Sequence, residues 1–373
     1  MQHILCRHSY CRYHIGFKLR LNAMRLVSFD YFRGVAILFI VAGHSFGAWP
    51  VDSFSEKVLA NIVYSGTALF VFISGFFFHH IFYKDFEMKY FMSKKAKNVL
   101  APYLILSTLG FCYFALSSEP FPFLDRMMAT DGSSWMDYVQ LYLSYLWTGR
   151  IMYAYWYIPF IMIMFLISPL FIGYIRLSLA PRLIIMLALL FFSAFFVHRP
   201  ILSMSPIHSV MYYIPVYLIG INCSINRESF ESFLKGKTLI FGVIVIVLAI
   251  IQAIYFDSRG APSKAEIFSY GGIDINIFQK IVLCFFFLSL LFRYEHKTIP
   301  GLKLLASYSF AIFFLHTWIL HITDQYRPYV LFTNVPDVVV WLGVITFTVI
   351  VSLIIAYLVK AALKHNSRYF IGF

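Results

Sequence analysis

Residues 338–359 read VVVWLGVITFTVIVSLIIAYLV and contain no charged side chain. As an α-helix this stretch extends about 33 Å, which is enough to cross a hydrocarbon core of about 30 Å. Residues 98–118 and 151–175 are two further stretches without charge. Over the whole chain 61% of the residues are hydrophobic and only 13% are charged, far from the composition of soluble globular proteins. The sequence therefore predicts an all-α, polytopic membrane protein.

Ten transmembrane helices are predicted along the chain. They lie at residues 31–49, 59–82, 98–116, 154–174, 182–197, 206–224, 238–256, 275–292, 303–323 and 338–359. With these spans, 21 of the 30 Lys and Arg residues fall on the side that holds both termini, and seven fall on the opposite side. Because basic residues are preferentially retained in the cytoplasm, both termini are predicted to be cytoplasmic. The same spread of basic residues along the chain argues against a nucleic-acid-binding face.

The predicted domain organisation is one membrane-embedded unit, residues 24–373, preceded by a basic segment, residues 1–23. That segment has neither the apolar core nor the small-residue cleavage site of a signal peptide. Because Met24 directly precedes the first recognisable element, residues 1–23 are interpreted either as a cytoplasmic tail or as sequence upstream of the translation start. The five cysteines show no paired spacing, so neither a disulfide framework nor a metal site is predicted.

The first predicted span places polar groups where hydrocarbon would penalise them, and it reads FDYFRGVAILFIVAGHS at residues 29–45. At about 100° per residue, Arg33 and His44 lie within about 20° of one helical face, and Asp30 neighbours Arg33. His44 lies about 16 Å further along the axis than Arg33. Titratable groups in a span require a protein-lined or hydrated cavity, which makes them functional candidates. The alternative for Asp30 and Arg33 is an interfacial ion pair. The alternative for His44 is a core imidazole bonded to a backbone carbonyl.

Four segments in sequence order resemble the acyltransferase-3 family of integral membrane O-acyltransferases. In that family an Asp, an Arg-Gly pair and a His-Ser pair recur along the first helix, as they do in residues 29–45. The later segments are ALFVFISGFFF, YWYIPFIMIMFLISPLF and SYSFAIFFLHTWIL, at residues 68–78, 155–171 and 307–320. The resemblance extends over roughly residues 25–360. It implies an enzyme, an acyltransferase that transfers groups other than amino-acyl groups.

The resemblance implies that His44 takes the proton of the acceptor hydroxyl or relays the acyl group, while Asp30 orients Arg33. A neutral imidazole with a pKa near 6.5 is suited to this work at neutral pH. His316 falls within the late segment of the resemblance and is expected to line the same cavity. His321 lies about 140° away from it on a helix, so the two do not form a metal-binding pair.

The donor site is expected near the basic residues Lys94, Lys95 and Lys97, together with Arg33. The family often shows an Arg-x-x-Arg motif before a Pro-Tyr pair, and here Lys95 and Asn98 replace the two arginines. A bidentate guanidinium grip is therefore absent at that place, but three lysines can still supply point charges for the phosphates of coenzyme A. The alternative role of these lysines is to retain the loop in the cytoplasm.

Two dipeptides in the resembling segments have alternative interpretations. Trp156 and Tyr157 fit either an aromatic belt at the membrane surface or a platform for stacking a sugar. Ser74 and Gly75 fit close helix packing, which is the simpler interpretation of a small-residue pair within a span.

The resulting expectation is a ten-span O-acyltransferase, with an O-acetyltransferase as the leading case, in a bacterial inner membrane. The acyl donor is expected to be acetyl-CoA or another short acyl-CoA, without a metal. The acceptor is expected to be a hydroxyl of a carbohydrate or lipid-linked glycan, as in polysaccharide modification. One alternative function is a transporter or flippase for a glycan or lipid, but the sequence shows no inverted repeat that would support it. Another is a purely structural scaffold, which would leave the polar helical face unexplained. Attack on a thioester also requires an oxyanion-stabilising group, which the sequence does not identify.

Overall fold

A computed structural model describes residues 26–127, 134–256 and 262–373, and the predicted basic segment 1–23 lies outside these residues. Helices make up almost all of the regular structure in the described ranges. The only strands there are β1 (Arg199–Pro200) and β2 (Ser263–Lys264), which pair in parallel. The predicted all-α, polytopic class is confirmed.

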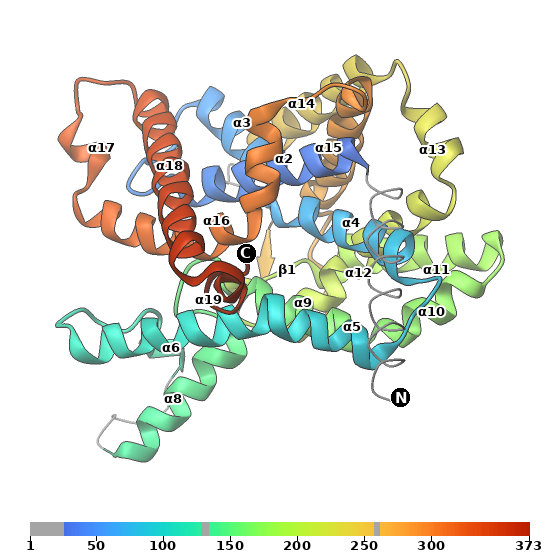
Figure 1. Ribbon diagram of the computed structural model, residues 1–373. Coiled ribbons are helices and arrows are strands. Elements are labelled where there is room, and N and C mark those ends of the chain that lie inside the picture. Colours follow the sequence, from blue (N-terminus) through green and yellow to red (C-terminus); the bar gives the residue numbers. More distant parts are fainter. Residues whose placement is uncertain (1–25, 128–133, 257–261) are drawn as a thin grey trace, which may run out of the picture.

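The helix boundaries follow in chain order. The first half of the described chain forms α2 (Val27–His44), α3 (Phe54–Val63), α4 (Thr67–Phe77), η1 (Phe78–Phe82), α5 (Met88–Lys95), η2 (Ala96–Leu100), α6 (Ala101–Leu116), α7 (Leu124–Met127), α8 (Trp135–Thr148), α9 (Tyr157–Leu166) and α10 (Ser168–Arg176). The second half forms α11 (Leu179–Phe192), η3 (Ser193–Val197), η4 (Ile201–Ser203), α12 (Pro206–Ile225), α13 (Arg227–Leu234), α14 (Thr238–Tyr255), α15 (Ile275–Leu291), η5 (Phe292–Tyr294), α16 (Pro300–Gln325), α17 (Pro328–Leu331), α18 (Asp337–Leu363), η6 (Lys364–Asn366) and α19 (Ser367–Ile371). Helix α2 lies near the middle of the molecule and packs against α16 and α4 (Figure 1).

Eight helical stretches of the described residues are long and apolar enough to cross a membrane, and α9 with α10 makes a ninth, bent by 53°. The eight are Val27–His44, Phe54–Phe82, Met88–Leu116, Leu179–Val197, Thr238–Tyr255, Ile275–Tyr294, Pro300–Leu331 and Asp337–Ile371. The remaining predicted span, residues 206–224, corresponds to α12, a 20-residue helix that is mostly buried inside the protein. It is not among the stretches whose length and hydropathy suit a membrane span, so the count of ten spans stays a prediction.

The first span begins four residues earlier than predicted, because a distant carboxylate caps it. Glu295 accepts hydrogen bonds from the backbone N–H groups of Val27 and Ser28, each at 2.8 Å. These are two of the N–H groups that have no partner within a helix, and a carboxylate also suits the positive end of the helix dipole. The Tyr31 hydroxyl fastens the next turn by donating to the Lys297 carbonyl at 2.6 Å. The start of α2 is thus held by the segment that leads into α16.

We expect the substitution Glu295→Ala to lower the free energy of unfolding by about 1–2 kcal/mol, the usual cost of losing a helix cap. Thermal unfolding of the purified protein in detergent measures the change. Glu266→Ala is the matched control, because Glu266 is exposed and caps no helix. Equal midpoints for the two variants would contradict the capping role.

The second span, predicted as one helix over residues 59–82, is broken between α3 and α4. Ser65 lies in this break with a positive φ of 66°. The break leaves carbonyl groups of α3 without helical partners, and Lys280 of α15 donates to those of Asn61 and Ile62, both at 2.7 Å. A buried lysine that satisfies freed carbonyls makes such a break tolerable inside a membrane protein.

Glycines allow two pairs of helices to approach closely. A Cβ atom on Gly34 of α2 would lie 2.8 Å from the Leu302 carbonyl oxygen at the start of α16. A Cβ atom on Gly75 of α4 would lie 2.1 Å from the Tyr217 carbonyl oxygen of α12, and one on Gly220 would lie 2.3 Å from the Phe72 carbonyl oxygen. Gly75 therefore has the helix-packing role that was considered for the Ser74–Gly75 pair.

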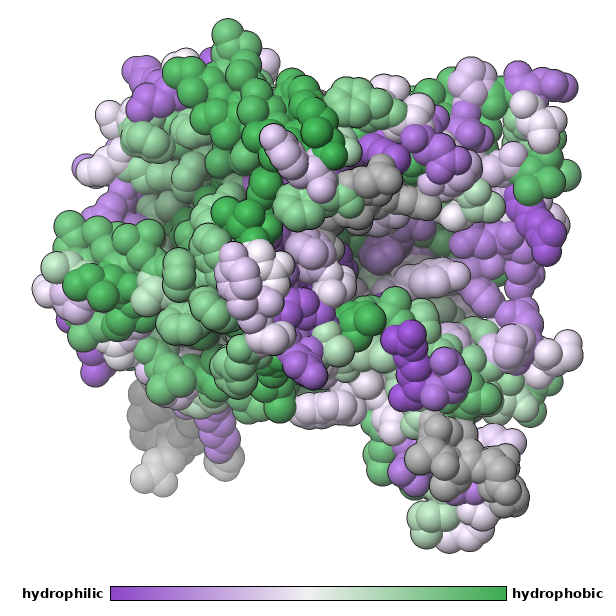
Figure 2. Space-filling model, turned by 180° about the vertical axis from the view of Figure 1, so that it is seen from behind, coloured by the Kyte–Doolittle hydropathy of each residue, from purple (hydrophilic) through white to green (hydrophobic). Residues whose placement is uncertain are grey.

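The outer helices present apolar side chains to their surroundings. Only 22% of the α11 stretch and 28% of each of the α14 and α18 stretches are buried within the protein. Exposed residues there include Leu187, Ile240 and Ile354, which are between 53% and 56% accessible. Figure 2 shows hydrophobic residues covering much of one half of the face in view, while hydrophilic residues gather toward the other half. Such a surface suits contact with lipid, since lipid chains are as apolar as these side chains.

The orientation of the spans remains a prediction from the basic-residue count. Reporter fusions after Met24 and at Phe373 are expected to report a cytoplasmic location, and a reporter inserted at Gly272 the opposite side. A reporter at either terminus that reports the outer side would contradict the predicted orientation, and termini on opposite sides would require an odd change in the number of spans.

Candidate active site

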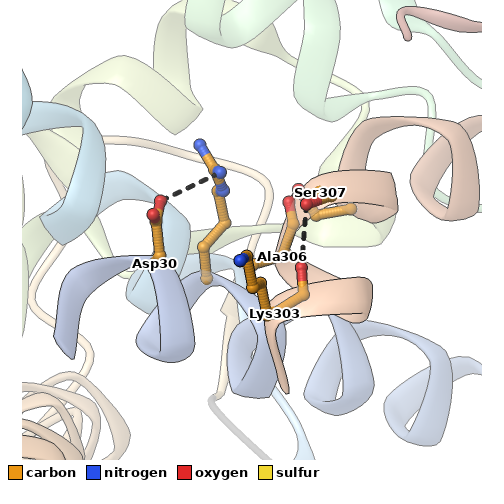
Figure 3. A network of polar contacts seen from close by, with 6 residues as sticks. Asp30, Lys303, Ala306 and Ser307 are labelled. Atoms are coloured by element: carbon orange, nitrogen blue, oxygen red, sulfur yellow. Dashed lines mark hydrogen bonds and ion pairs between the residues drawn. The ribbon is translucent and has the colours of Figure 1, made fainter. Parts of the chain in front are cut away.

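The acid and guanidinium of the first span form an ion pair. Arg33 Nη2 lies 3.2 Å from Asp30 Oδ1, and their side chains are 32% and 15% exposed. Figure 3 shows the Asp30 carboxylate paired along α2, beside the first turns of α16 that carry Lys303, Ala306 and Ser307. The close approach allowed by Gly34 brings these two helices together here. The guanidinium is therefore held at a fixed place near the start of α2.

A cavity of about 300 Å³ opens beside this ion pair. Asp30, Arg33 and Lys95 supply its charged groups, and most of the other lining residues are apolar. These are Leu26, Phe70, Ile73, Phe77, Phe78, Ile81, Phe82, Phe91, Val99, Ile161, Phe165 and Phe310, with Ser74, Tyr157 and Tyr217 as the uncharged polar ones. The volume is at the lower end of the range of small-molecule sites.

One of the three predicted donor-site lysines reaches this cavity. The Lys95 ammonium lies 4.3 Å from the centre of the Phe165 ring, and 5.1 Å from the centres of the Phe82 and Phe91 rings. Aromatic faces attract a cation and hold it in place. Lys94 and Lys97 do not line the cavity, and Lys97 is exposed. Of the three lysines, only Lys95 is therefore placed to act inside this cavity.

His44 borders a second, smaller cavity of about 20 Å³, which has room for about one water molecule. The two cavities share Phe70, Tyr157 and Phe310 as lining residues, so they adjoin inside the protein. The cationic groups of the larger cavity and the imidazole at the end of α2 therefore border neighbouring cavities. Trp156 also lines the second cavity and is only 3% exposed, so it lies inside the protein and not in a lipid-facing aromatic belt.

The structure brings His44 and His316 together from two helices, with ring centres 5.6 Å apart. His316 Nδ1 lies 3.0 Å from the Ile312 carbonyl oxygen, one turn earlier in α16. A carbonyl only accepts, so Nδ1 of a neutral His316 carries the proton and Nε2 carries a lone pair. Nε2 of His316 is buried and has no hydrogen-bond partner in the described chain. Bonding of an imidazole to a backbone carbonyl, the alternative considered for His44, is therefore found at His316.

Other residues of the same segments lie elsewhere. The Ser45 hydroxyl donates to the Val41 carbonyl at 2.7 Å, along its own helix. His321 Nε2 lies 2.9 Å from Glu119 Oε2 and borders neither cavity. His316, not His321, is therefore the α16 histidine that lies beside His44. His316 is not among the residues that line either cavity, so it meets His44 by ring contact and not across the expected shared cavity.

Two arginines that were predicted only as residues of outer loops lie near His44. The charges of Arg199 and Arg150 are both close enough to His44 to interact with it. The Arg199 guanidinium lies 5.4 Å from the centre of the Trp156 ring. No sequence signal identified them, because neither loop carries a helical or strand periodicity that would relate it to His44.

The described part of the chain thus combines helices apolar enough to cross a membrane, an ion pair that lines one cavity and an imidazole that lines an adjoining one. A family model described as an acyltransferase domain matches residues 26–357 of the 373-residue chain. The chain belongs to the acyltransferase-3 family, and it is an acyltransferase that transfers groups other than amino-acyl groups. No curated protein and no solved structure matches the chain.

Proposed function

We propose that this membrane acyltransferase moves a short acyl group, with acetyl as the leading case, from acyl-CoA to a hydroxyl of a carbohydrate or lipid-linked glycan. The observation that carries the proposal is the pair of adjoining cavities, one lined by Arg33 and Lys95 and the other by His44, whose ring centre lies 5.6 Å from that of His316. The proposed location is a bacterial inner membrane, where cytoplasmic acyl-CoA and a membrane-bound acceptor meet.

The residues of the larger cavity suit acyl-CoA. Arg33 and Lys95 would hold its phosphates, and the apolar walls would surround the rest of the bound portion. When bound, acyl-CoA supplies an acyl group activated as a thioester. The Asp30 carboxylate keeps the Arg33 guanidinium in position, 3.2 Å away.

His44 is the proposed general base for the acceptor hydroxyl. It makes no hydrogen bond to any described residue, so its ring nitrogens are available to a substrate, and it borders a cavity with room for about one water molecule. His316 is the proposed positioning residue, because its proton is fixed at Nδ1 and its Nε2 can accept a hydrogen bond from a neighbouring donor. A hydrogen bond from His44 to His316 Nε2, formed when the acceptor binds, would hold the base in the way that alcohol activation requires.

The transporter alternative is less well supported by the cavities. A glycan passage must be wide enough for a sugar, whereas the His44 cavity has a volume of only about 20 Å³. A narrow end beside an imidazole suits a bond-forming step with a small acyl group better than passage of a glycan.

Substitution of Lys95 with glutamine is expected to raise KM for acyl-CoA by about fivefold, which corresponds to about 1 kcal/mol of lost attraction. KM for the acceptor should change less, and the effect should shrink at high salt. Lys97→Gln is the matched control, since Lys97 is exposed and lies two residues away.

Neutralising Lys94, Lys95 and Lys97 together should add little to the effect of Lys95→Gln. If the single Lys95 variant and the Lys97 control behave alike, the loop would keep only its role in topology.

Two measurements test the proposed reaction. Purified protein should bind coenzyme A, which a scaffold or a glycan flippase has no reason to do. Mass spectrometry of surface glycans from cells with and without the protein should show the loss of one acetyl increment. A different increment would change the acyl group, and unchanged glycans together with absent coenzyme A binding would overturn the proposal.

A further inference from the structure

Arg150 is a buried cation with no charged partner among the residues that the structure describes. It is 8% exposed and follows α8 in the segment that leads to α9. Its Nη1 donates to the Tyr153 carbonyl at 3.2 Å, and its guanidinium lies 4.4 Å from the centre of the Phe123 ring. Its Nε is buried without a hydrogen-bond partner in the described chain. A buried guanidinium with an unused donor requires an acceptor.

Arg199 is the second cation of this region. Its guanidinium donates to the Ser203 hydroxyl at 3.2–3.3 Å and to the Ser65 hydroxyl at 3.4 Å, and it lies over the Trp156 ring. Pairing of β1 with β2 fixes the backbone of Arg199 opposite Ser263. None of these contacts is anionic, so the positive charge is held in place by neutral groups.

The two arginines repel one another and have no carboxylate within salt-bridge distance among the described residues. Burial, and then the charge of Arg199, lower the pKa of Arg150 to about 10. Asp274 is the acidic residue whose charge acts on Arg199. Its carboxylate accepts hydrogen bonds from Tyr212 at 2.7 Å (Oδ2) and from the Asn276 N–H at 2.9 Å (Oδ1), and its single negative charge offsets only one of the two positive charges. The pair therefore keeps an excess of positive charge.

This excess charge lies beside the proposed base. Both arginines interact electrostatically with His44. Trp156 connects the two places, because its ring lines the His44 cavity and also contacts the Arg199 guanidinium. The basic-residue count predicts that both arginines are on the outer side, opposite Arg33 and Lys95.

We propose that Arg150 and Arg199 bind the anionic group of the acyl acceptor, a carboxylate or a phosphate, and so place its hydroxyl near His44. Guanidinium groups bind both kinds of oxyanion through paired hydrogen bonds, and such a ligand relieves the repulsion between the two cations. The inference rests on the proposed function and makes it more specific. The acceptor is then an acidic or phosphate-bearing glycan.

The test measures binding to the purified full-length protein in detergent, without acyl-CoA. The probes are methyl glucuronide for a carboxylate, glucose 6-phosphate for a phosphate, and methyl glucoside as the neutral sugar. Isothermal titration should show binding of at least one anionic probe at least about tenfold tighter than binding of methyl glucoside. The preferred probe identifies which oxyanion the site takes.

The substitutions Arg150→Gln and Arg199→Gln should each weaken that binding by at least about tenfold. Arg126→Gln is the matched control, because Arg126 lies on the same predicted side and is 46% exposed. Arg150→Lys keeps the charge in case the Gln variant fails to fold, and it should bind more weakly than the wild type because a lysine cannot replace a guanidinium fork.

Equal binding of charged and neutral probes, or an equal loss in the Arg126 variant, would overturn the inference. His44→Ala separates this result from a failure of the proposed function, since it should keep anion binding and lose acyl transfer. Acyl transfer by the wild type without selective anion binding would leave the enzyme proposal intact and remove the anion site. Selective anion binding together with an active His44→Ala variant would keep the anion site and the acyltransferase, and would remove only the role of His44 as the base.

Discussion

The substitution His44→Ala is expected to lower acyl transfer by at least about a hundredfold, while membrane insertion and coenzyme A binding stay unchanged. A general base contributes about this much or more. His44 ends α2 and borders a small cavity. Its loss removes the proton acceptor, and a water molecule in the vacated space would be a much weaker base than an imidazole. Because no described residue hydrogen-bonds to the ring, its removal should disturb folding little.

His44→Gln distinguishes proton transfer from hydrogen bonding, because glutamine keeps polar atoms but cannot take a proton at neutral pH. It should be nearly as inactive as the alanine variant. His321→Gln is the control, since this histidine lies on α16 but pairs with Glu119 outside both cavities. Acyl transfer rates with purified protein measure all three. Substantial activity in the His44→Gln variant would make His44 structural and His316 the next base to test.

The substitution Gly75→Ala is expected to destabilise the protein by more than about 3 kcal/mol, or to prevent its accumulation. The added Cβ atom would lie 2.1 Å from the Tyr217 carbonyl oxygen, where both atoms belong to rigid helices. Helices α4 and α12 would have to separate, and both line the larger cavity through Ser74 and Tyr217. Gly220→Ala should behave similarly, since its Cβ atom would lie 2.3 Å from the Phe72 carbonyl oxygen.

Gly343→Ala provides the comparison, because Gly343 lies within α18 and no atom lies within 4 Å of the added Cβ position. That change should be neutral or slightly stabilising, given the higher helix propensity of alanine. Protein yield and the thermal unfolding midpoint in detergent measure these variants. A Gly75→Ala protein with normal yield and midpoint would show that the helices at this crossing can move apart freely.

Much of the site on α2 could be predicted because a single helix obeys a fixed period. Asp30 and Arg33 are three residues apart, so their ion pair follows from helical geometry alone, and the structure contains it. The start of α2 could not be predicted in the same way. Glu295 is 268 residues from Val27 in the sequence, and no local pattern relates a cap to a helix so far away.

The lysines show where the sequence could narrow the choice but not complete it. The sequence marked Lys94, Lys95 and Lys97 together, because all three are basic residues before a Pro-Tyr pair. Side chains at positions 94, 95 and 97 point in different directions around a helix, and only tertiary packing decides which direction is inward. The rings of Phe82 and Phe165, from two other elements, surround Lys95 and no other member of the group in this way.

The sequence by itself determined that the chain is a polytopic helical membrane protein, since long charge-free stretches can satisfy their backbone groups in lipid only as helices. It also determined the polar face of α2, and its resemblance to a family marked His316. The tertiary structure alone decided that His316 lies 5.6 Å from His44 and that Arg150 and Arg199 approach the same imidazole. Helical period is a local property, whereas these meetings depend on how separate helices and loops pack, and that packing is set by contacts distant in the sequence.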